Sequence, residues 1–172
     1  MLSKSSIENQ VRYILLIFSV FLFSLTVISC KSSDDDITSS TGLFVTVGDN
    51  GIILTSSDGT AWDNRISGTT YNLVGITYVN STFVTVGYNG TILVSSNGTA
   101  WTSRTSGTSE HLYEVTYGEG LFVVVGENAT ILTSSDGITW TERDGLRSKW
   151  AIPKYLKVFT YRKKLFVAVG LN

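Results

Sequence analysis

The feature that constrains the fold most is a stretch of 19 residues that occurs three times. It reads FVTVGDNGIILTSSDGTAW from Phe44, FVTVGYNGTILVSSNGTAW from Phe83 and FVVVGENATILTSSDGITW from Phe122. Both steps between these Phe residues are 39 positions long, from 44 to 83 and from 83 to 122. A fixed period of this length is typical of repeat architectures, in which each repeat forms one small unit of structure.

Each repeat divides into four short segments rich in Val, Ile, Thr and aromatic residues, as β-strands are. In the second repeat these segments are residues 73–79, 82–87, 91–96 and 99–104. Asn-Gly fills the two later gaps, at Asn89-Gly90 and Asn97-Gly98. Asn-Gly is favoured in two-residue hairpin turns, because both central residues need positive φ. The sequence therefore predicts an antiparallel four-stranded meander from each repeat.

The second segment of each repeat needs cover on both faces. In the third repeat Leu121, Val123 and Val125 alternate with Phe122 and Val124, so both faces are apolar. A meander with one wet face would alternate polar and apolar residues, whereas sheets stacked radially around an axis bury both faces. The expected fold is all-β, a β-propeller of four-stranded antiparallel blades after an N-terminal signal helix. A β-solenoid is the alternative, although its rungs are usually shorter.

The propeller repeats span residues 42–172 and number about three and a third. They are residues 43–81, 82–120 and 121–164, and a partial repeat at 165–172 restarts with LFVAVG. Propellers have about four to eight blades, so three interpretations stay open. The chain is the front of a longer propeller, or two chains self-associate to close one ring, or the repeats form an open arc with exposed edges.

Three segments resemble Asp-box repeats: Ser56–Trp62, Ser95–Trp101 and Ser134–Trp140, which read SSDGTAW, SSNGTAW and SSDGITW. Such repeats, also called BNR repeats, occur in sialidase-type propellers and in propellers similar to the photosystem II assembly factor. The family pattern is S-x-D-x-G-x-T-W, from which this chain departs by a shorter spacing and by Asn97 in place of Asp. The resemblance implies a propeller fold and leaves the function open.

The recurring polar and Trp residues of these segments are predicted to be structural. An Asp or Asn between Ser and Gly at a turn accepts hydrogen bonds from nearby backbone N–H groups, and the Trp packs on the same hairpin. A motif present in every blade serves every blade rather than one site. The predicted structural residues are Asp58, Trp62, Asn97, Trp101, Asp136 and Trp140.

Residues 1–29 have the pattern of a lipoprotein signal peptide. Lys4 and Arg12 precede an apolar run that ends at Ser29, and polar residues follow Cys30. The junction VISC resembles the bacterial lipobox, which implies cleavage before Cys30 and attachment of lipid to its sulfur. The alternatives are simple secretion and an uncleaved anchor, although the run is about 17 residues and a spanning helix needs about 20.

Residues 30–41 are predicted to form a flexible tether, because they are rich in Ser and Asp and have little apolar surface to bury. The expected location is the bacterial cell envelope, on the exported side, with the protein held to a membrane by its lipid anchor. The formal net charge of −1 gives no reason to expect a nucleic acid partner. The single Cys excludes an internal disulfide.

No catalytic or metal-binding pattern stands out, so we expect neither an enzyme nor a cofactor. His111 is the single His, which excludes a multi-His metal site. Arg65, Arg104 and Arg143 recur at the 39-residue spacing, and sialidases clamp a carboxylate with three Arg. Their three Arg residues do not come from equivalent blade positions, and no unrepeated pair of acids accompanies these ones. A sialidase-like or glycosidase-like hydrolase is the alternative.

Positions at which the repeats differ are better candidates for binding, because the fold does not dictate them. Tyr71 and Asn72 correspond to Glu110 and His111 one repeat later, and the third repeat has five extra residues within the basic segment 143–157. The candidate binding residues are Tyr71, Glu110, His111, Lys149, Trp150 and Tyr155. We expect a non-catalytic binding or scaffolding module for a protein or glycan partner, with an envelope assembly factor as the alternative. A solvated loop in a degenerating repeat is the alternative for the basic segment.

Overall fold

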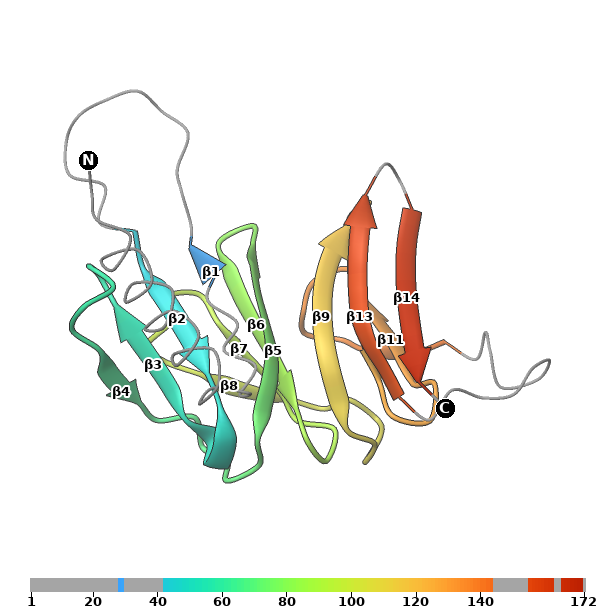
Figure 1. The fold of residues 1–172 in the computed structure, drawn as a ribbon, viewed down its shortest axis with the longest axis horizontal. Coiled ribbons are helices and arrows are strands. Elements are labelled where there is room, and N and C mark those ends of the chain that lie inside the picture. The colour runs from blue at the N-terminus through green and yellow to red at the C-terminus, as the bar shows by residue number, and fades with distance from the viewer. Residues whose placement is uncertain (1–27, 30–41, 144–154, 163–164, 172) are drawn as a thin grey trace, which may run out of the picture.

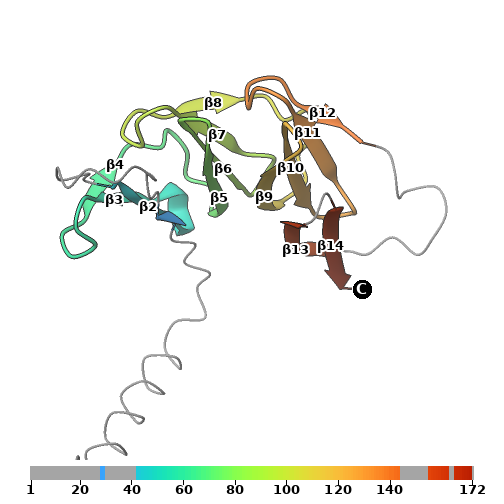
Figure 2. The ribbon, with the colours of Figure 1, turned by 90° about the horizontal axis from the view of Figure 1, so that it is seen from above.

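The structure is a computed structural model that describes residues 28–29, 42–143, 155–162 and 165–171. It contains three four-stranded antiparallel sheets and one two-stranded sheet (Figure 1). Seen from above, the sheets follow one another along an arc (Figure 2). The all-β prediction is confirmed, and the sheets are arranged as the blades of an incomplete propeller.

The second and third sheets are complete four-stranded meanders in strand order. The second sheet is formed by β5 (Leu73–Val79), β6 (Thr82–Gly87), β7 (Ile92–Ser95) and β8 (Thr102–Arg104). The third sheet is formed by β9 (Leu112–Gly118), β10 (Leu121–Gly126), β11 (Ile131–Ser134) and β12 (Thr141–Glu142). Each sheet therefore starts one strand earlier than the repeat boundaries drawn from the sequence at residues 82 and 121.

The first and fourth sheets differ from this pattern at their edges. The first sheet is formed by β1 (Ile28–Ser29), β2 (Phe44–Val47), β3 (Ile53–Ser56) and β4 (Asp63–Arg65), with the short 3₁₀ turn η1 (Asp49–Gly51) between β2 and β3. The fourth sheet is β13 (Tyr155–Arg162) paired with β14 (Leu165–Leu171). Strand β1 pairs with Phe44 and Val45, so the last two residues of the predicted signal peptide lie where β5 and β9 lie in the complete sheets.

The hairpin turns are of two kinds, and only one kind follows the prediction. Asn89 and Gly90 both have positive φ, at 54° and 63°, as a two-residue turn requires. At Asn97-Gly98 only Gly98 has positive φ, and six residues separate the end of β7 at Ser95 from the start of β8 at Thr102. The predicted tight turn there was wrong, because the Asn97 side chain, rather than two positive φ angles, organises a longer loop.

The hydrophobic core lies between sheets rather than on one face of each. Val84 and Val86 of the second sheet pack with Leu112 and Val124 of the third sheet. The opposite face of the second sheet, with Phe83, packs against the first sheet in a separate cluster. Burial of a Val, Leu or Phe side chain contributes about 1.5–3 kcal/mol, so the contacts between neighbouring sheets stabilise the fold. Within the described residues, no helix is long and apolar enough to cross a membrane.

Candidate functional site

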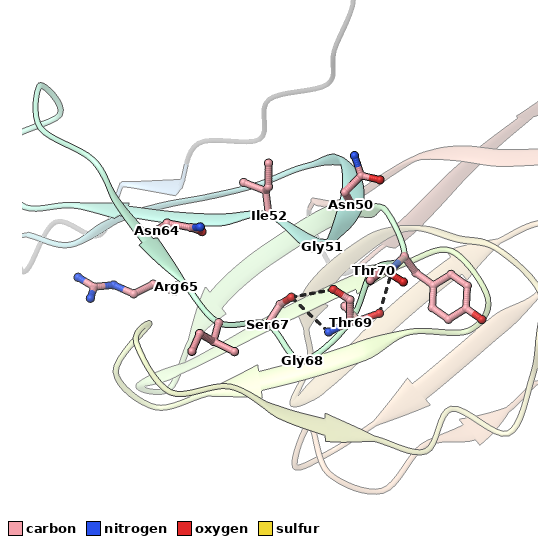
Figure 3. A pocket seen from close by; sticks show the side chains of 11 residues that line it. Asn50, Gly51, Ile52, Asn64, Arg65, Ser67, Gly68, Thr69 and Thr70 are labelled. Carbon is pink, nitrogen blue, oxygen red and sulfur yellow. Dashed lines mark hydrogen bonds between the residues drawn. The ribbon is translucent and has the colours of Figure 1, made fainter.

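A pocket of about 570 Å³ lies on the first sheet, between the turn that joins β2 to β3 and the loop that follows β4. It is lined by residues 50–52 and 64–71 (Figure 3). We call this the Tyr71 pocket. Its walls come from the β2–β3 turn of the first sheet and from the loop that connects β4 to β5 of the second sheet.

The loop at residues 66–71 is held in place by its own short polar side chains. The Ser67 hydroxyl donates to the Thr69 carbonyl at 3.2 Å, and the Tyr71 N–H donates to the Thr69 hydroxyl at 3.1 Å. Gly51, with φ of +72°, allows the Thr69 carbonyl to approach so closely that a Cβ at this position would collide with it. The same arrangement recurs at Gly90 with Ser106 and Thr108, so the pocket floor belongs to the repeat.

The apolar lining of the Tyr71 pocket does not belong to the repeat. Five large hydrophobic side chains are exposed among the described residues, and three of them line this pocket: Ile52 at 45%, Ile66 at 88% and Tyr71 at 48%. Their counterparts 39 residues later are Thr91, Thr105 and Glu110. Exposed apolar side chains are ordinary when single, but a cluster of them marks an interaction surface. The fold did not require these three residues, since the second blade forms without them.

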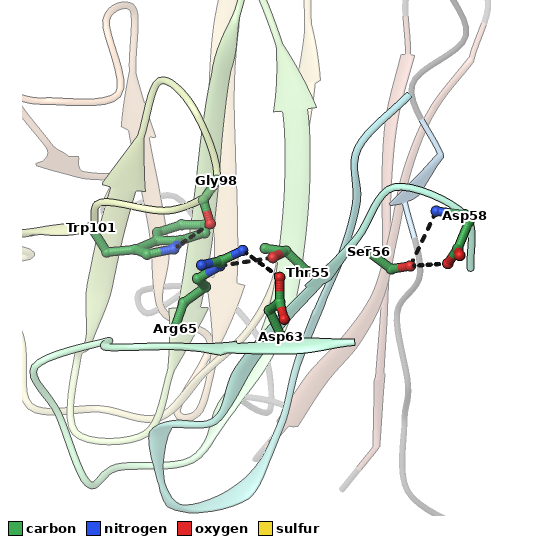
Figure 4. A network of polar contacts seen from close by, with 7 residues as sticks. All are labelled: Thr55, Ser56, Asp58, Asp63, Arg65, Gly98 and Trp101. Atoms are coloured by element: carbon green, nitrogen blue, oxygen red, sulfur yellow. Dashed lines mark hydrogen bonds and ion pairs between the residues drawn. The ribbon is translucent and has the colours of Figure 1, made fainter. Parts of the chain in front are cut away.

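The one charged side chain of the pocket is already neutralised. Arg65 Nε donates to Thr55 Oγ1 at 2.8 Å, and Arg65 Nη2 donates to Asp63 Oδ2 at 3.0 Å (Figure 4). The remaining polar lining comes from Asn, Ser and Thr side chains. The pocket therefore suits an apolar group flanked by neutral hydrogen-bonding groups, and is a poor clamp for an anion.

Glu110 and His111, which the sequence indicates as candidates for binding, contact two different hairpin turns. His111 Nδ1 accepts from the Asn89 N–H at 3.2 Å and stacks on Tyr88, with ring centroids 4.2 Å apart. Asn72 makes the equivalent hydrogen bond in the first blade, where its Oδ1 accepts from the Asn50 N–H at 3.0 Å. Glu110 Oε2 accepts from Asn128 Nδ2 at 2.9 Å. These side chains help to hold the hairpin turns, whereas Tyr71 is an exposed residue that lines the Tyr71 pocket.

Of the other candidate residues, the structure describes only the backbone of Tyr155. Cys30, Lys149 and Trp150 lie outside the described residues, and Tyr155 is the first residue of β13, where only the backbone is described. Their lipidation and binding roles stay predictions.

One set of hydrogen bonds recurs in three turns that each contain a Ser followed two residues later by Asp or Asn. We call them the Ser-Asx turns, and they are Ser56–Trp62, Ser95–Trp101 and Ser134–Trp140. In the first, Asp58 Oδ1 accepts from the N–H groups of Thr60 at 2.8 Å and Ala61 at 2.9 Å, and Trp62 Nε1 donates to the Gly59 carbonyl at 3.2 Å. Asn97 and Trp101 repeat these contacts in the second turn, and Asp136 and Trp140 repeat them in the third.

These hydrogen bonds shift the acidity of the turn carboxyls. Backbone N–H groups of Thr139 and then Ile138, followed by the Ser134 hydroxyl, lower the pKa of Asp136 to about 2. The N–H groups of Ala61 and Thr60 likewise lower the pKa of Asp58 below its ordinary value. Both carboxylates are thus ionised at neutral pH and committed to their own backbone. They are unsuited to act as a general acid.

Glu114 is the acid of the described residues whose pKa is raised, and the cause is its burial on β9. Glycoside hydrolysis usually needs two carboxyl groups flanking one bond, and the turn carboxylates do not supply the second. Within the part of the chain that the structure describes, no group of three or more His, Cys, Asp or Glu residues could hold a metal ion.

No protein-family model and no curated protein matches this chain. Among solved structures, the chain is similar to one described as "YCF48 bound to D1 peptide", with a TM-score of 0.58 and 16% sequence identity. The similarity covers 86% of this chain and 50% of that one, so the chain spans about half the length of the protein it matches. At this identity the likeness shows the fold alone, and the fold it shows is that of an incomplete β-propeller.

Proposed function

We propose that the protein is a non-catalytic binding module that recognises an extended protein segment through the Tyr71 pocket. The observation that carries this proposal is the cluster of Ile52, Ile66 and Tyr71, which is exposed, lines one pocket and is absent from the equivalent place in the second blade. The similar solved structure holds a peptide, which supports a peptide as the class of partner.

The pocket offers two means of holding such a segment. An apolar side chain of the partner would cover Ile66 and Tyr71, at about 25 cal/mol for each Å² of apolar surface removed from water. Strand β4 ends in Asn64 and Arg65 at the pocket, and within the described structure it pairs with β3 alone. Its other edge can accept an extended segment as an added strand, as many peptide-binding sheets do.

The location we propose is the bacterial cell envelope, with lipid on Cys30 and residues 30–41 as the tether. Support comes from the lipobox-like junction and from the composition of the segment that follows it. Metabolic labelling with a palmitate analogue tests it, because Cys30→Ser should abolish incorporation. Labelling that persists in Cys30→Ser would contradict lipidation at this residue.

Two further proposals rest on the sequence. One is that two chains self-associate to close a ring, and the other is that Lys149 and Trp150 form a second binding surface. Light scattering combined with small-angle scattering tests the first, and a compact dimer is the expected result of ring closure. Loss of a partner in a Lys149→Ala, Trp150→Ala double variant of unchanged thermal stability would support the second. A partner retained by that variant would exclude this segment.

The experiment for the Tyr71 pocket is a selection from a displayed library of random peptides. Clones that bind wild-type protein are counter-selected against Ile66→Ser, which changes a side chain that is 88% exposed and leaves the core intact. We expect enrichment of extended peptides with one or two large apolar residues. Enrichment that is equal on the wild type and on Ile66→Ser would overturn the proposed site.

A further inference from the structure

Three arginines at the same blade position have different numbers of partners. Arg65 has two, since its Nε donates to Thr55 Oγ1 and its Nη2 pairs with Asp63. Arg143 has one within the part of the chain that the structure describes, since its Nε donates to Thr133 Oγ1 at 2.8 Å. Arg104 has none among the described residues, and its Nε is buried without an acceptor. A buried N–H group without a partner is uncommon in a folded protein and calls for an explanation.

The sequence explains how Arg104 lost its partners. Val94 stands where the other blades have Thr55 and Thr133, and Thr102 stands where the first blade has Asp63. Val has nearly the shape of Thr but carries a methyl group in place of the hydroxyl, so the packing survives while the acceptor disappears. The second blade thus keeps the Arg but, within the described residues, has neither of the side-chain partners that Arg65 has.

Arg104 lines a pocket of about 350 Å³ between the second and third sheets. Strands β7 and β8 of the second sheet contribute Val94 and Thr102, and the Ser-Asx turn of the third contributes Asp136 and Ile138. None of the residues that line this pocket lines the Tyr71 pocket.

We propose that the pocket at Arg104 is a second binding site, and that it takes a carboxylate group. The two Nη nitrogens of a guanidinium form a planar pair of donors that matches the two oxygens of a carboxylate. Ile138 lies exposed at the pocket and can cover the carbon chain that carries this group. This proposal is independent of the one for the Tyr71 pocket, so a test that contradicts one leaves the other unaffected.

The charge of Asp136 selects a carboxylate over a phosphate. Asp136 Oδ1 accepts hydrogen bonds from the Ile138 and Thr139 N–H groups and from the Ser134 hydroxyl, which offset part of its charge. The rest of the Asp136 charge repels any anion in the pocket. This repulsion is twice as large for a dianion such as hydrogen phosphate as for a singly charged anion. A singly charged carboxylate balances Arg104 without this additional cost.

The test uses the full chain in detergent and follows the Nε–H signals of Arg65, Arg104 and Arg143 by NMR at constant ionic strength. The probes are acetate, the blocked peptide Ac-Ala-Glu-Ala-NH₂, its Gln counterpart and inorganic phosphate. We expect saturable shifts of Arg104 with the two carboxylates, and no saturable shift with the Gln peptide. Tighter binding of the Glu peptide than of acetate would assign the carboxylate to a polypeptide, and equal binding would assign it to a small free acid.

Two variants and one control decide the role of Arg104. Val94→Thr with Thr102→Asp gives Arg104 the partners that Arg65 has, and should weaken carboxylate binding at least tenfold, as should Arg104→Gln. Thr133→Val makes the converse exchange in the third blade and should leave binding at Arg104 unchanged. Absence of saturable shifts in the wild type, undiminished binding in both variants, or tighter binding of phosphate than of carboxylate would overturn the proposal.

Discussion

At the scale of single residues, the three Ser-Asx turns form a natural comparison between a carboxylate and an amide. Asp136 and Asn97 accept hydrogen bonds from the two equivalent backbone N–H groups of their own turns. The distances are 2.8–2.9 Å for Asp136 and 2.9–3.0 Å for Asn97. The geometry therefore needs an acceptor and not a charge. The charge should instead appear in how stability depends on pH.

We expect the free energy of unfolding to fall as the pH is lowered from about 4 towards 2. The pKa of Asp136 is lowered from 3.8 to about 2 in the folded state, so its contribution is complete above pH 3.8 and is lost as the pH falls through the folded value. Asp136→Asn should flatten this acid limb while keeping the turn. Urea unfolding at pH 2–6 measures the effect.

Asn97→Asp is the matched control, because it places a titrating acid in the neutral turn and should steepen the same limb. An acid limb that is identical in the wild type, Asp136→Asn and Asn97→Asp would contradict this account of the turns.

The glycine at the Asn-Gly turn carries a second prediction at this scale. Gly90 has φ of +63° and would collide with the Thr108 carbonyl if it had a Cβ, whereas Gly107 has φ of +82° and open space around it. Gly107→Ala should cost about 1 kcal/mol for the left-handed conformation alone. Gly90→Ala should cost at least about 2 kcal/mol, because the collision is added. Equal losses in chemical denaturation would mean that the approach of the loop does not matter.

At the scale of strands and sheets, the sequence predicted the inner strands well and the outer strand poorly. Val, Ile and Phe alternation located β5 and β6 almost to the residue. The predicted outer strand begins at Thr99, but β8 begins at Thr102. The reason is that the N–H groups of Thr99 and Ala100 donate hydrogen bonds to the Asn97 side chain instead of to a neighbouring strand. Strand β1 could not have been predicted, because its residues carry the composition of a signal peptide.

The candidate site was predictable in part. Tyr71 was identified because the repeats differ there, and Ile52 and Ile66 differ from their counterparts in the same way. They were missed because isoleucines among strands are ordinarily core residues. Only the fold of loop 66–71 over Gly51 shows that they are exposed. The lost partners of Arg104 likewise depend on the cross-strand register, which pairs Val94 with Thr102, two residues before Arg104.

Packing between sheets leads to a prediction at this scale. Leu112 is fully buried where the second and third sheets meet, so Leu112→Ala should lower the free energy of unfolding by about 2–5 kcal/mol. Ile66→Ala removes the same number of carbons from a side chain that is 88% exposed, and should change it by less than about 0.5 kcal/mol. Equilibrium denaturation compares them directly. Similar losses for both would mean that Ile66 is part of the core.

At the scale of the whole molecule, the blades share a scaffold, and the places where they differ provide the binding chemistry. The Ser-Asx turns and the glycine-packed loops recur from blade to blade. The exposed apolar cluster at Tyr71 occurs in the first blade and the unpartnered guanidinium in the second. A repeat fold allows this division, because each blade depends chiefly on its neighbours for stability.

The measurement that tests this division most directly is the affinity of a library-selected peptide for Ile52→Thr, Ile66→Thr, Tyr71→Glu. This triple variant gives the first blade the residues that the second blade already has at those positions, so the fold has accepted them once. We predict binding at least tenfold weaker than that of the wild type, with a melting temperature within about 2 °C. Undiminished affinity in a folded triple variant would contradict the claim that the Tyr71 pocket is the binding site.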